Sequence, residues 1–211
     1  MRITKLGHCC LIVEIKGKRI LTDPGSYSTL QDEQKNIDII LITHEHGDHL
    51  HIESLKKVLV NNPSAQIITN TAVGKLLDVE SIKYQILEGT TSGTFLGVLL
   101  EAFDARHEEI YEEFGQVQNT GYFIENTLFY PGDAFYNPGK PVDILALPVA
   151  GPWMRLKRAI EYGKEIKPRI CFPVHDGILV NPELGSRLPS MILPKLGIEF
   201  RVLEIGKEEE I

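Results

Sequence analysis

The sequence predicts an α/β (α+β) fold in which two mixed β-sheets pack face to face with helices on their outer faces, an αββα sandwich. Three observations support this prediction. The chain opens with short apolar segments separated by turns, strand and helix patterns alternate after them, and the second half repeats that coarse order. We expect one domain covering residues 1–211, because no linker-like stretch divides the chain.

The first half is expected to form an antiparallel meander followed by alternating strands and helices. A turn at Lys16-Gly17-Lys18 separates two of the early strands. Residues 37–43 (IDIILIT) form a continuous apolar run, which is typical of a strand that is buried on both faces. The predicted strands are 1–6, 9–15, 19–22, 37–43 and 66–69, and the predicted helices are 52–60 and 72–77.

The second half shows the same succession of elements. Strands are predicted at 97–105 and 121–130, and the apolar run 143–149 (DILALPV) predicts another buried strand. A helix is expected over 153–166 and ends at Lys167-Pro168, because proline cannot continue a helix. Residues 169–174 form the last predicted strand, and the acidic tail 207–211 is expected to be solvated.

Composition favours a cytoplasmic protein that acts on a small molecule. The chain has 22 Lys and Arg against 29 Asp and Glu, and its net charge of −7 gives no general attraction to nucleic acid or anionic membranes. No segment has the apolar length of a signal peptide or a spanning helix. Cys9, Cys10 and Cys171 lie in apolar runs, so we expect buried thiols rather than disulfides or a shared metal site.

The strongest chemical signal is the segment His44-Glu45-His46-Gly47-Asp48-His49, directly after the buried strand 37–43. It places four side chains able to bind a metal within six residues. His44 and His46 can reach one ion if the loop is extended. Asp48 and His49 follow a turn eased by Gly47 and can face a second ion.

This HEHGDH segment resembles the H-x-H-x-D-H signature of the metallo-β-lactamase superfamily. The resemblance requires three further residues, and the chain supplies each of them at the end of a predicted strand. They are a histidine in Asp104-Ala105-Arg106-His107, an aspartate in Tyr130-Pro131-Gly132-Asp133 and a histidine in Phe172-Pro173-Val174-His175. The resemblance covers residues 1 to about 176, and it implies the fold predicted above.

Carried over to this chain, the resemblance implies a site for two metal ions. His44, His46 and His107 would bind the first ion, Asp48, His49 and His175 the second, and Asp133 would bridge both. In the family's di-iron members a carboxylate replaces the second histidine of the signature, whereas this chain keeps His46. We therefore expect two divalent ions, with zinc first and manganese or iron as alternatives.

The site is expected to hydrolyse a small ester, lactone or phosphodiester through a hydroxide shared by the two ions. Asp48 is the carboxylate expected to orient the water or move its proton. Asp133, as the bridging ligand, is the second residue expected to be catalytic. The alternatives are a metal-binding sensor or scaffold without turnover, and a nuclease, which the acidic composition disfavours.

Two residues are candidates for supporting the metal ligands. Leu21-Thr22-Asp23-Pro24 resembles a family element in which the aspartate accepts a hydrogen bond from a metal-binding histidine. An ordinary turn residue before Pro24 is the alternative for Asp23. Gly7-His8 resembles the opening of the small branch related to ascorbate-6-phosphate lactonases, so His8 either lies near the metals or begins a strand.

Other positions stay open at this stage. His51 is expected to open a helix rather than bind a metal. Trp153 either contacts a ligand or packs in the core, and Arg155 either meets an anionic group or begins a helix. The loop 105–118 is rich in glutamate and would disfavour polyanionic substrates, unless it is a solvated face. Oligomeric state and physiological substrate are not predicted.

Overall fold

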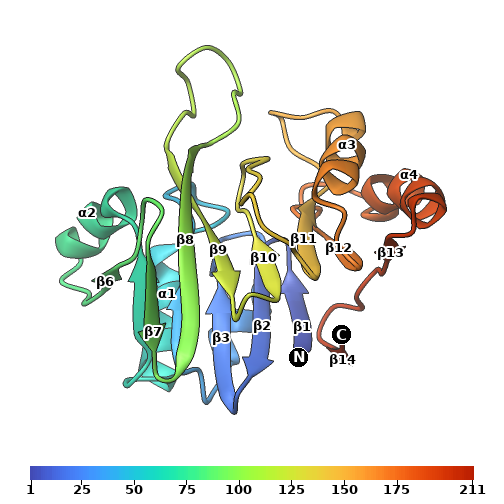
Figure 1. The fold of residues 1–211 in the computed structure, drawn as a ribbon. Coiled ribbons are helices and arrows are strands. Elements are labelled where there is room, and N and C mark those ends of the chain that lie inside the picture. The colour runs from blue at the N-terminus through green and yellow to red at the C-terminus, as the bar shows by residue number, and fades with distance from the viewer.

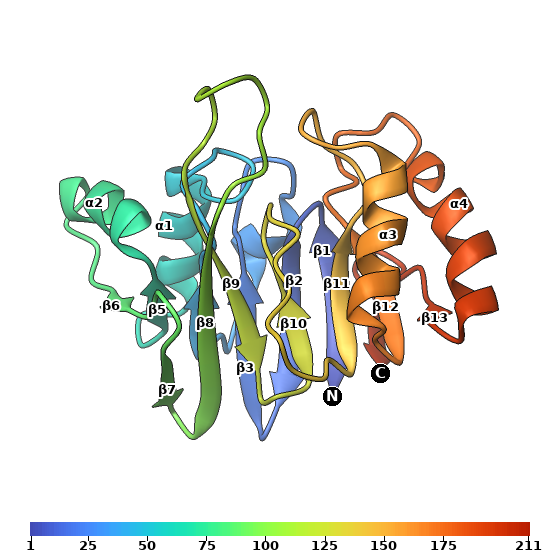
Figure 2. The same ribbon diagram turned by 45° about the horizontal axis from the view of Figure 1, so that its top comes forward.

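The computed structural model describes residues 1–211 and contains two seven-stranded mixed sheets with helices on their outer faces (Figure 1). The αββα sandwich expected from the sequence is confirmed. Figure 2 shows α1 and α2 on one side of the sandwich and α3 and α4 toward the other. No helix has the length and apolar character needed to span a membrane.

The first sheet has the strand order β14-β1-β2-β3-β4-β5-β6. Strands β1 to β3 form an antiparallel meander, and β3 to β6 run parallel. Its elements are β1 (Arg2–Gly7), β2 (Cys10–Ile15), β3 (Lys18–Thr22), the 3-10 helix η1 (Leu30–Glu33), β4 (Ile39–Leu41), α1 (Ile52–Asn61), β5 (Gln66–Thr69), α2 (Thr71–Val79), β6 (Gln85–Ile86) and β14 (Glu208–Glu210).

The second sheet repeats this plan with the order β13-β12-β11-β10-β9-β8-β7. Strands β7 to β10 are antiparallel, and β10 to β13 run parallel. Its elements are β7 (Ser92–Phe95), β8 (Val98–Arg106), β9 (Gln118–Ile124), β10 (Leu128–Tyr130), β11 (Ile144–Pro148), α3 (Leu156–Ile166), β12 (Ile170–Val174), α4 (Glu183–Ile192), the 3-10 helix η2 (Leu193–Leu196) and β13 (Glu199–Phe200).

The alternation of side chains along the strands builds three apolar layers. In β4, Ile39 and Leu41 face the layer between the two sheets, while Ile40 packs in the layer formed with α1 and α2. On the second sheet, Phe123 and Leu145 pack in the layer that includes α3. Both faces of each sheet are therefore covered, which explains why the central strands read as continuous apolar runs.

The strands that carry the candidate site residues run in one direction. β1, β3 and β4 share a direction in the first sheet, and β8, β10, β11 and β12 share one in the second. Their carboxyl ends meet at the upper edge of the sandwich, beneath the long loop between β8 and β9 (Figure 1). Segments far apart in the sequence are therefore brought to one edge.

Three sequence predictions need correction. The strand predicted at 121–130 is two strands, β9 and β10, joined by a turn in which Glu125 and Asn126 have positive φ. The acidic tail is not merely solvated, because β14 pairs with β1 and the backbone N–H of Ile211 donates to the carbonyl of Met1 (3.0 Å). The helix predicted at 153–166 begins three residues later, at Leu156.

A buried ion pair ties the two sheets together. The Nζ of Lys5, in β1, donates to both carboxylate oxygens of Asp176 (2.7 and 2.6 Å) and to the carbonyl of Pro173 (2.9 Å), at the end of β12. Lys5 is 2% exposed and Asp176 6%. A buried charge that loses its partner is strongly unfavourable, whereas the intact pair satisfies both groups.

We predict that Lys5→Met lowers the free energy of unfolding by about 3–5 kcal/mol, because it leaves Asp176 buried without a partner. Urea unfolding measures this change. Lys16→Met, which breaks the surface pair with Glu125, is the control and should cost less than about 1 kcal/mol. A loss of under about 1 kcal/mol for Lys5→Met would show that the pair does not join the sheets.

Candidate metal centre

All seven residues predicted to hold metal ions lie together at the shared strand edge. Each follows the carboxyl end of a strand, so the side chains project from loops held by a rigid scaffold. The loop after β4 supplies four of them, and one each follows β8, β10 and β12. They are His44, His46, Asp48, His49, His107, Asp133 and His175.

Three imidazoles form the first group. The ring centroids of His44 and His46 are 4.9 Å apart, those of His46 and His107 4.6 Å, and those of His44 and His107 5.1 Å. One nitrogen of each ring lies within 4.8 Å of a nitrogen of the other two. Three imidazole nitrogens at such spacing can serve one ion.

The second group comprises Asp48, His49, Asp133 and His175. Asp133 lies between the groups. Its Oδ2 is 2.8 Å from His175 Nε2 and 3.2 Å from His107 Nε2, while its Oδ1 is 3.2 Å from His49 Nε2. This carboxylate is therefore within reach of ligands from both groups.

Hydrogen bonds fix which nitrogen of each imidazole carries the proton. The Nδ1–H of His107 donates to the carbonyl of Glu108 (2.6 Å), and the Nδ1–H of His49 donates to Asp23 Oδ2 (2.7 Å). Because a carbonyl or a carboxylate can only accept, the Nδ1 atoms of both rings carry a proton, and their Nε2 atoms face the carboxylate of Asp133. Each of these Nε2 atoms therefore needs a proton or a cation between it and the carboxylate.

Cations fit this arrangement. The Nε2 atoms of His44, His49 and His175 and the Oδ1 of Asp133 are buried and have no hydrogen-bond partner. Buried polar atoms in folded proteins are almost always satisfied. Imidazole nitrogens together with carboxylate oxygens are the donor set that zinc and related divalent ions prefer, so the residues present fit metal ions.

Burial and neighbouring charges set the ionisation of these groups. Burial lowers the pKa of His44 well below its usual value, and the imidazole of His49 adds to this effect. Burial opposes ionisation of Asp133, but His49 and His175 hold its pKa well below the usual range. Asp133 in turn keeps the pKa of His49 well above normal, against the effect of burial. Positive charge beside this carboxylate is therefore favourable.

Asp23 lies behind the candidate metal ligands, where the resemblance places it. It is fully buried, and it accepts hydrogen bonds from the backbone N–H and the hydroxyl of Thr43 (both 2.8 Å) and from the hydroxyl of Tyr130 (2.7 Å). With the bond from His49, four donors converge on one carboxylate. Asp23 therefore holds the ring of His49 with its Nε2 toward Asp133.

Sequence reasoning missed Asn119, which lies in β9. Its Oδ1 accepts the backbone N–H of Asp133 (2.9 Å), and its Nδ2 donates to the carbonyl of Pro131 (2.9 Å). Gly132 has a φ of +64°, and a Cβ there would lie 2.2 Å from Asn119 Oδ1. The glycine and the asparagine together fix the turn that presents Asp133, and only the Gly132-Asp133 pair leaves a signal in the sequence.

From the sequence we expected Gly47 to ease the turn of the HEHGDH loop, but a different glycine is required there. Gly47 does not have a positive φ, and a Cβ there would meet nothing within 4 Å. Gly25 is the restrictive glycine, because a Cβ there would lie 1.7 Å from the carbonyl oxygen of Asp48. The close approach of these two backbones positions the loop.

His8 lies beside the centre rather than merely at a strand end. The backbone N–H of Gly177 donates to its Nδ1 (3.0 Å), so its Nε2 carries the proton and donates to Asp48 Oδ2 (3.2 Å). With both ring nitrogens engaged, His8 orients Asp48. Cys9 packs between the sheets but also lies near His49 and His175, a proximity that the sequence did not predict.

The remaining cysteines and His51 behave as expected. Cys10 and Cys171 are buried in the apolar layers, and all three cysteines are free thiols. His51 precedes the first residue of α1, and its Nδ1 is 3.1 Å from Ser54 Oγ. It lies in neither of the two candidate groups of ligands.

A cavity of about 370 Å³, which we call the metal cavity, opens beside the two groups. Trp153 packs in the core against Phe135, as one of its two interpretations expected, and it also lines this cavity. Arg155 is exposed, occupies the N-cap position of α3 without a side-chain hydrogen bond and does not line the metal cavity. The loop between β8 and β9 contributes Ile110 and Phe114, and none of its glutamates.

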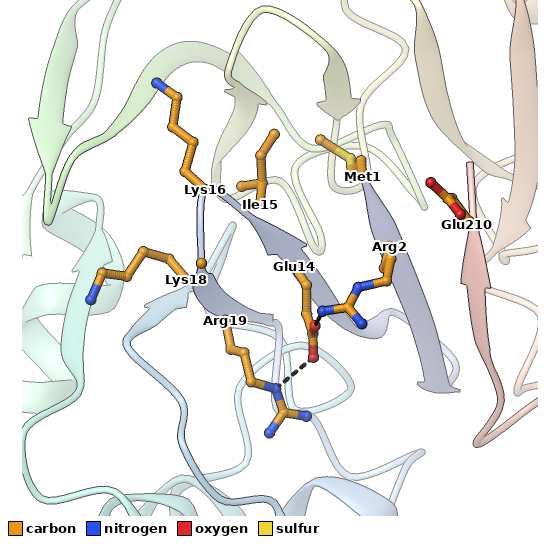
Figure 3. A pocket seen from close by; sticks show the side chains of 9 residues that line it. Met1, Arg2, Glu14, Ile15, Lys16, Lys18, Arg19 and Glu210 are labelled. Atoms are coloured by element: carbon orange, nitrogen blue, oxygen red, sulfur yellow. Dashed lines mark hydrogen bonds and ion pairs between the residues drawn. The ribbon is translucent and has the colours of Figure 1, made fainter.

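A second, polar cavity lies at the amino end of β3, opposite the metal centre (Figure 3). Its cationic side chains are paired with carboxylates. Arg2 and Arg19 both contact Glu14, and Lys18 pairs with Asp38 (2.9 Å). These cations are neutralised within the protein, so this cavity offers no unpaired group for an anion.

Fold and site together define a protein of the αββα class with a histidine- and aspartate-rich metal centre. Residues 2–175 match the family described as the beta-lactamase superfamily domain. The chain therefore belongs to the metallo-β-lactamase superfamily, as the HEHGDH segment predicted.

Individual relatives agree with this assignment. Protein Rv0786c of Mycobacterium tuberculosis is 30% identical over 96% of both chains. UPF0173 metal-dependent hydrolase TK0141 of Thermococcus kodakarensis is 27% identical over the whole of both. A crystal structure from Parabacteroides distasonis, provisionally described as a metal-dependent hydrolase, has 27% identity and a TM-score of 0.78 and covers 96% of this chain and 92% of its own.

A more distant structure shows the same fold. Igni18, a metallo hydrolase from Ignicoccus hospitalis, is 22% identical, has a TM-score of 0.77 and covers 100% of this chain and 98% of its own. The relatives named as metal-dependent hydrolases support that class for this chain.

We predict that Asp23→Asn weakens the binding of divalent metal by about 10–100-fold, because the amide no longer holds His49 in one tautomer. Competition with a chromogenic chelator measures the affinity, and ¹⁵N NMR of the imidazole nitrogens reports the tautomer. Asp38→Asn is the matched control, since Asp38 also accepts a backbone N–H (2.9 Å) but precedes β4, at the other end of that strand. Equal affinity of the two variants would contradict the role of Asp23.

Proposed function

We propose that this chain is a hydrolase that holds two divalent metal ions, with zinc as the first choice, and cleaves a small ester, lactone or phosphodiester. His44, His46 and His107 would hold one ion, and Asp48, His49 and His175 the other, with Asp133 between them. The observation that carries the proposal is the set of buried, unpartnered imidazole and carboxylate atoms facing one another around Asp133.

Such ions, when bound, polarise the scissile bond and lower the pKa of water toward neutrality. The chain's own residues supply orientation and proton handling. Both Asp48 and Asp133 line the cavity, and Asp48 is the more exposed of the two, with a side chain 21% exposed against 2% for Asp133. His175 and His8 hold the pKa of Asp48 below its usual value despite its burial, so the carboxylate is ionised and can orient water as a hydrogen-bond acceptor.

The form of the cavity favours a small molecule. Its volume of about 370 Å³ is within the range of sites for small ligands. No lysine or arginine lines it, which gives nucleic-acid phosphates no partner beside the metal centre. A nuclease is accordingly the less supported alternative.

The test combines elemental analysis of the purified protein with a screen of chromogenic esters, lactones, thioesters and phosphodiesters. We expect close to two metal ions per chain and hydrolysis of at least one class. Asp133→Asn should lose metal and lower kcat/KM by at least about 100-fold, because it removes the carboxylate shared by both groups. Asp143→Asn, which alters only an exposed pair with Arg169, is the matched control and should retain both properties.

Full activity of metal-free protein would refute the proposal. Tight binding of metal without turnover of any substrate above the metal-free control would favour a sensor or scaffold. Cleavage of nucleic acid alone would favour a nuclease.

A further inference from the structure

We propose that the substrate of this site carries an uncharged apolar group, such as an acyl chain or an aryl ring, and that this group lies in a trough beside the metal cavity. The inference rests on the proposed hydrolytic function and narrows it to apolar esters and lactones. It disfavours phosphorylated substrates.

The trough is formed by the loops that follow β11 and β12 and by the starts of α3 and α4. Its volume is about 460 Å³, and we call it the apolar trough. Seven of its ten lining residues are hydrophobic, and none is charged. Its larger apolar side chains are those of Val149, Met154, Leu156, Ile178, Leu179 and Leu184.

The apolar trough adjoins the metal cavity directly. Pro152 and Ile178 line both of them, so a molecule can extend from one into the other across these two residues. The loops that carry them rise at the same edge of the sandwich, beside α3 and α4 (Figure 2). The reacting bond of an extended substrate can therefore lie at the metal centre while its tail lies in the trough.

The rim of the metal cavity has the same character. Tyr27, Phe114 and Ile178 line the cavity and are exposed on its outer side. Adjacent exposed apolar residues on a soluble protein surface mark a binding site, whereas scattered single residues do not. Leu184, which lines the trough, is 62% exposed and adds to this apolar surface.

Neither cavity contains a partner for an anionic substituent. No lysine or arginine lines the metal cavity or the apolar trough. A phosphate or carboxylate away from the reacting bond would therefore meet apolar side chains, and its desolvation would be uncompensated. An alkyl or aryl group in the same place would instead be stabilised by leaving water.

The experiment compares p-nitrophenyl esters of acetate, butyrate, hexanoate and octanoate with the metal-loaded protein. We expect kcat/KM to rise by about two- to fourfold for each added methylene, as burial of methylene groups predicts. Leu184→Asp and Ile178→Asn should flatten this rise. Leu188→Asp is the matched control, because Leu188 is also exposed on α4 but does not line the trough.

A binding measurement gives a readout independent of turnover. Trp153 is the only tryptophan, and it lines the metal cavity, so its fluorescence reports occupation of the site. Octanohydroxamate and acetohydroxamate share a metal-binding head and differ in the tail. We expect octanohydroxamate to bind at least about 30-fold more tightly in the metal-loaded protein, and Leu184→Asp to remove most of that difference.

The outcomes separate this inference from the proposed function. Hydrolysis that does not depend on chain length, together with equal affinity for both hydroxamates, would show that the trough does not bind the substrate. The proposed hydrolase function would then still stand. Absence of ester hydrolysis with tighter binding of octanohydroxamate would count against the proposed reaction, but it would support binding of an apolar group in the trough. If Leu184→Asp only changes the oligomeric state and leaves the chain-length dependence intact, the surface is a contact between copies and the inference is wrong.

Discussion

The structure depends on one electrostatic constraint, the placement of buried imidazole nitrogens against a buried carboxylate. Asp133 is surrounded by imidazole nitrogens from three separate loops, and the hydrogen bonds behind His49 and His107 direct their Nε2 atoms toward it. Protons or cations must occupy the positions between them, because acceptors cannot satisfy acceptors. The strand directions, the network at Asp23 and the turn held by Asn119 all serve to maintain this arrangement.

The fold that meets this constraint uses the same strand arrangement in both sheets. Each sheet is a meander followed by parallel strands, and the parallel strands deliver their following loops to one edge. The ion pair between Lys5 and Asp176 joins the sheets close to that edge, one residue beyond His175. Because both faces of each sheet are packed, the strand ends at this edge are rigid. They hold the imidazoles and carboxylates of the candidate metal centre at fixed positions relative to one another.

Much of this was predictable from sequence because the signals are local. The apolar run before His44, the spacing of the HEHGDH segment and the glycine before Asp133 each reflect a strand end or turn formed by neighbouring residues. The resemblance then placed His107 and His175, whose convergence the structure confirms. Asp23 was recognised for the same reason, although its four hydrogen-bond donors come from distant segments.

The remainder depends on long-range contacts that leave no local pattern. Asn119 supports Asp133 only because β9 lies beside β10, and β14 is a run of glutamates held by backbone hydrogen bonds to β1. The apolar trough is assembled from two loops and the starts of α3 and α4, and the sequence did not predict α4. Anomalous diffraction from crystals of the zinc-loaded protein tests the central claim most directly. The account predicts two ions on either side of Asp133, one at His44, His46 and His107 and the other at Asp48, His49 and His175, whereas a single ion or ions elsewhere would contradict it.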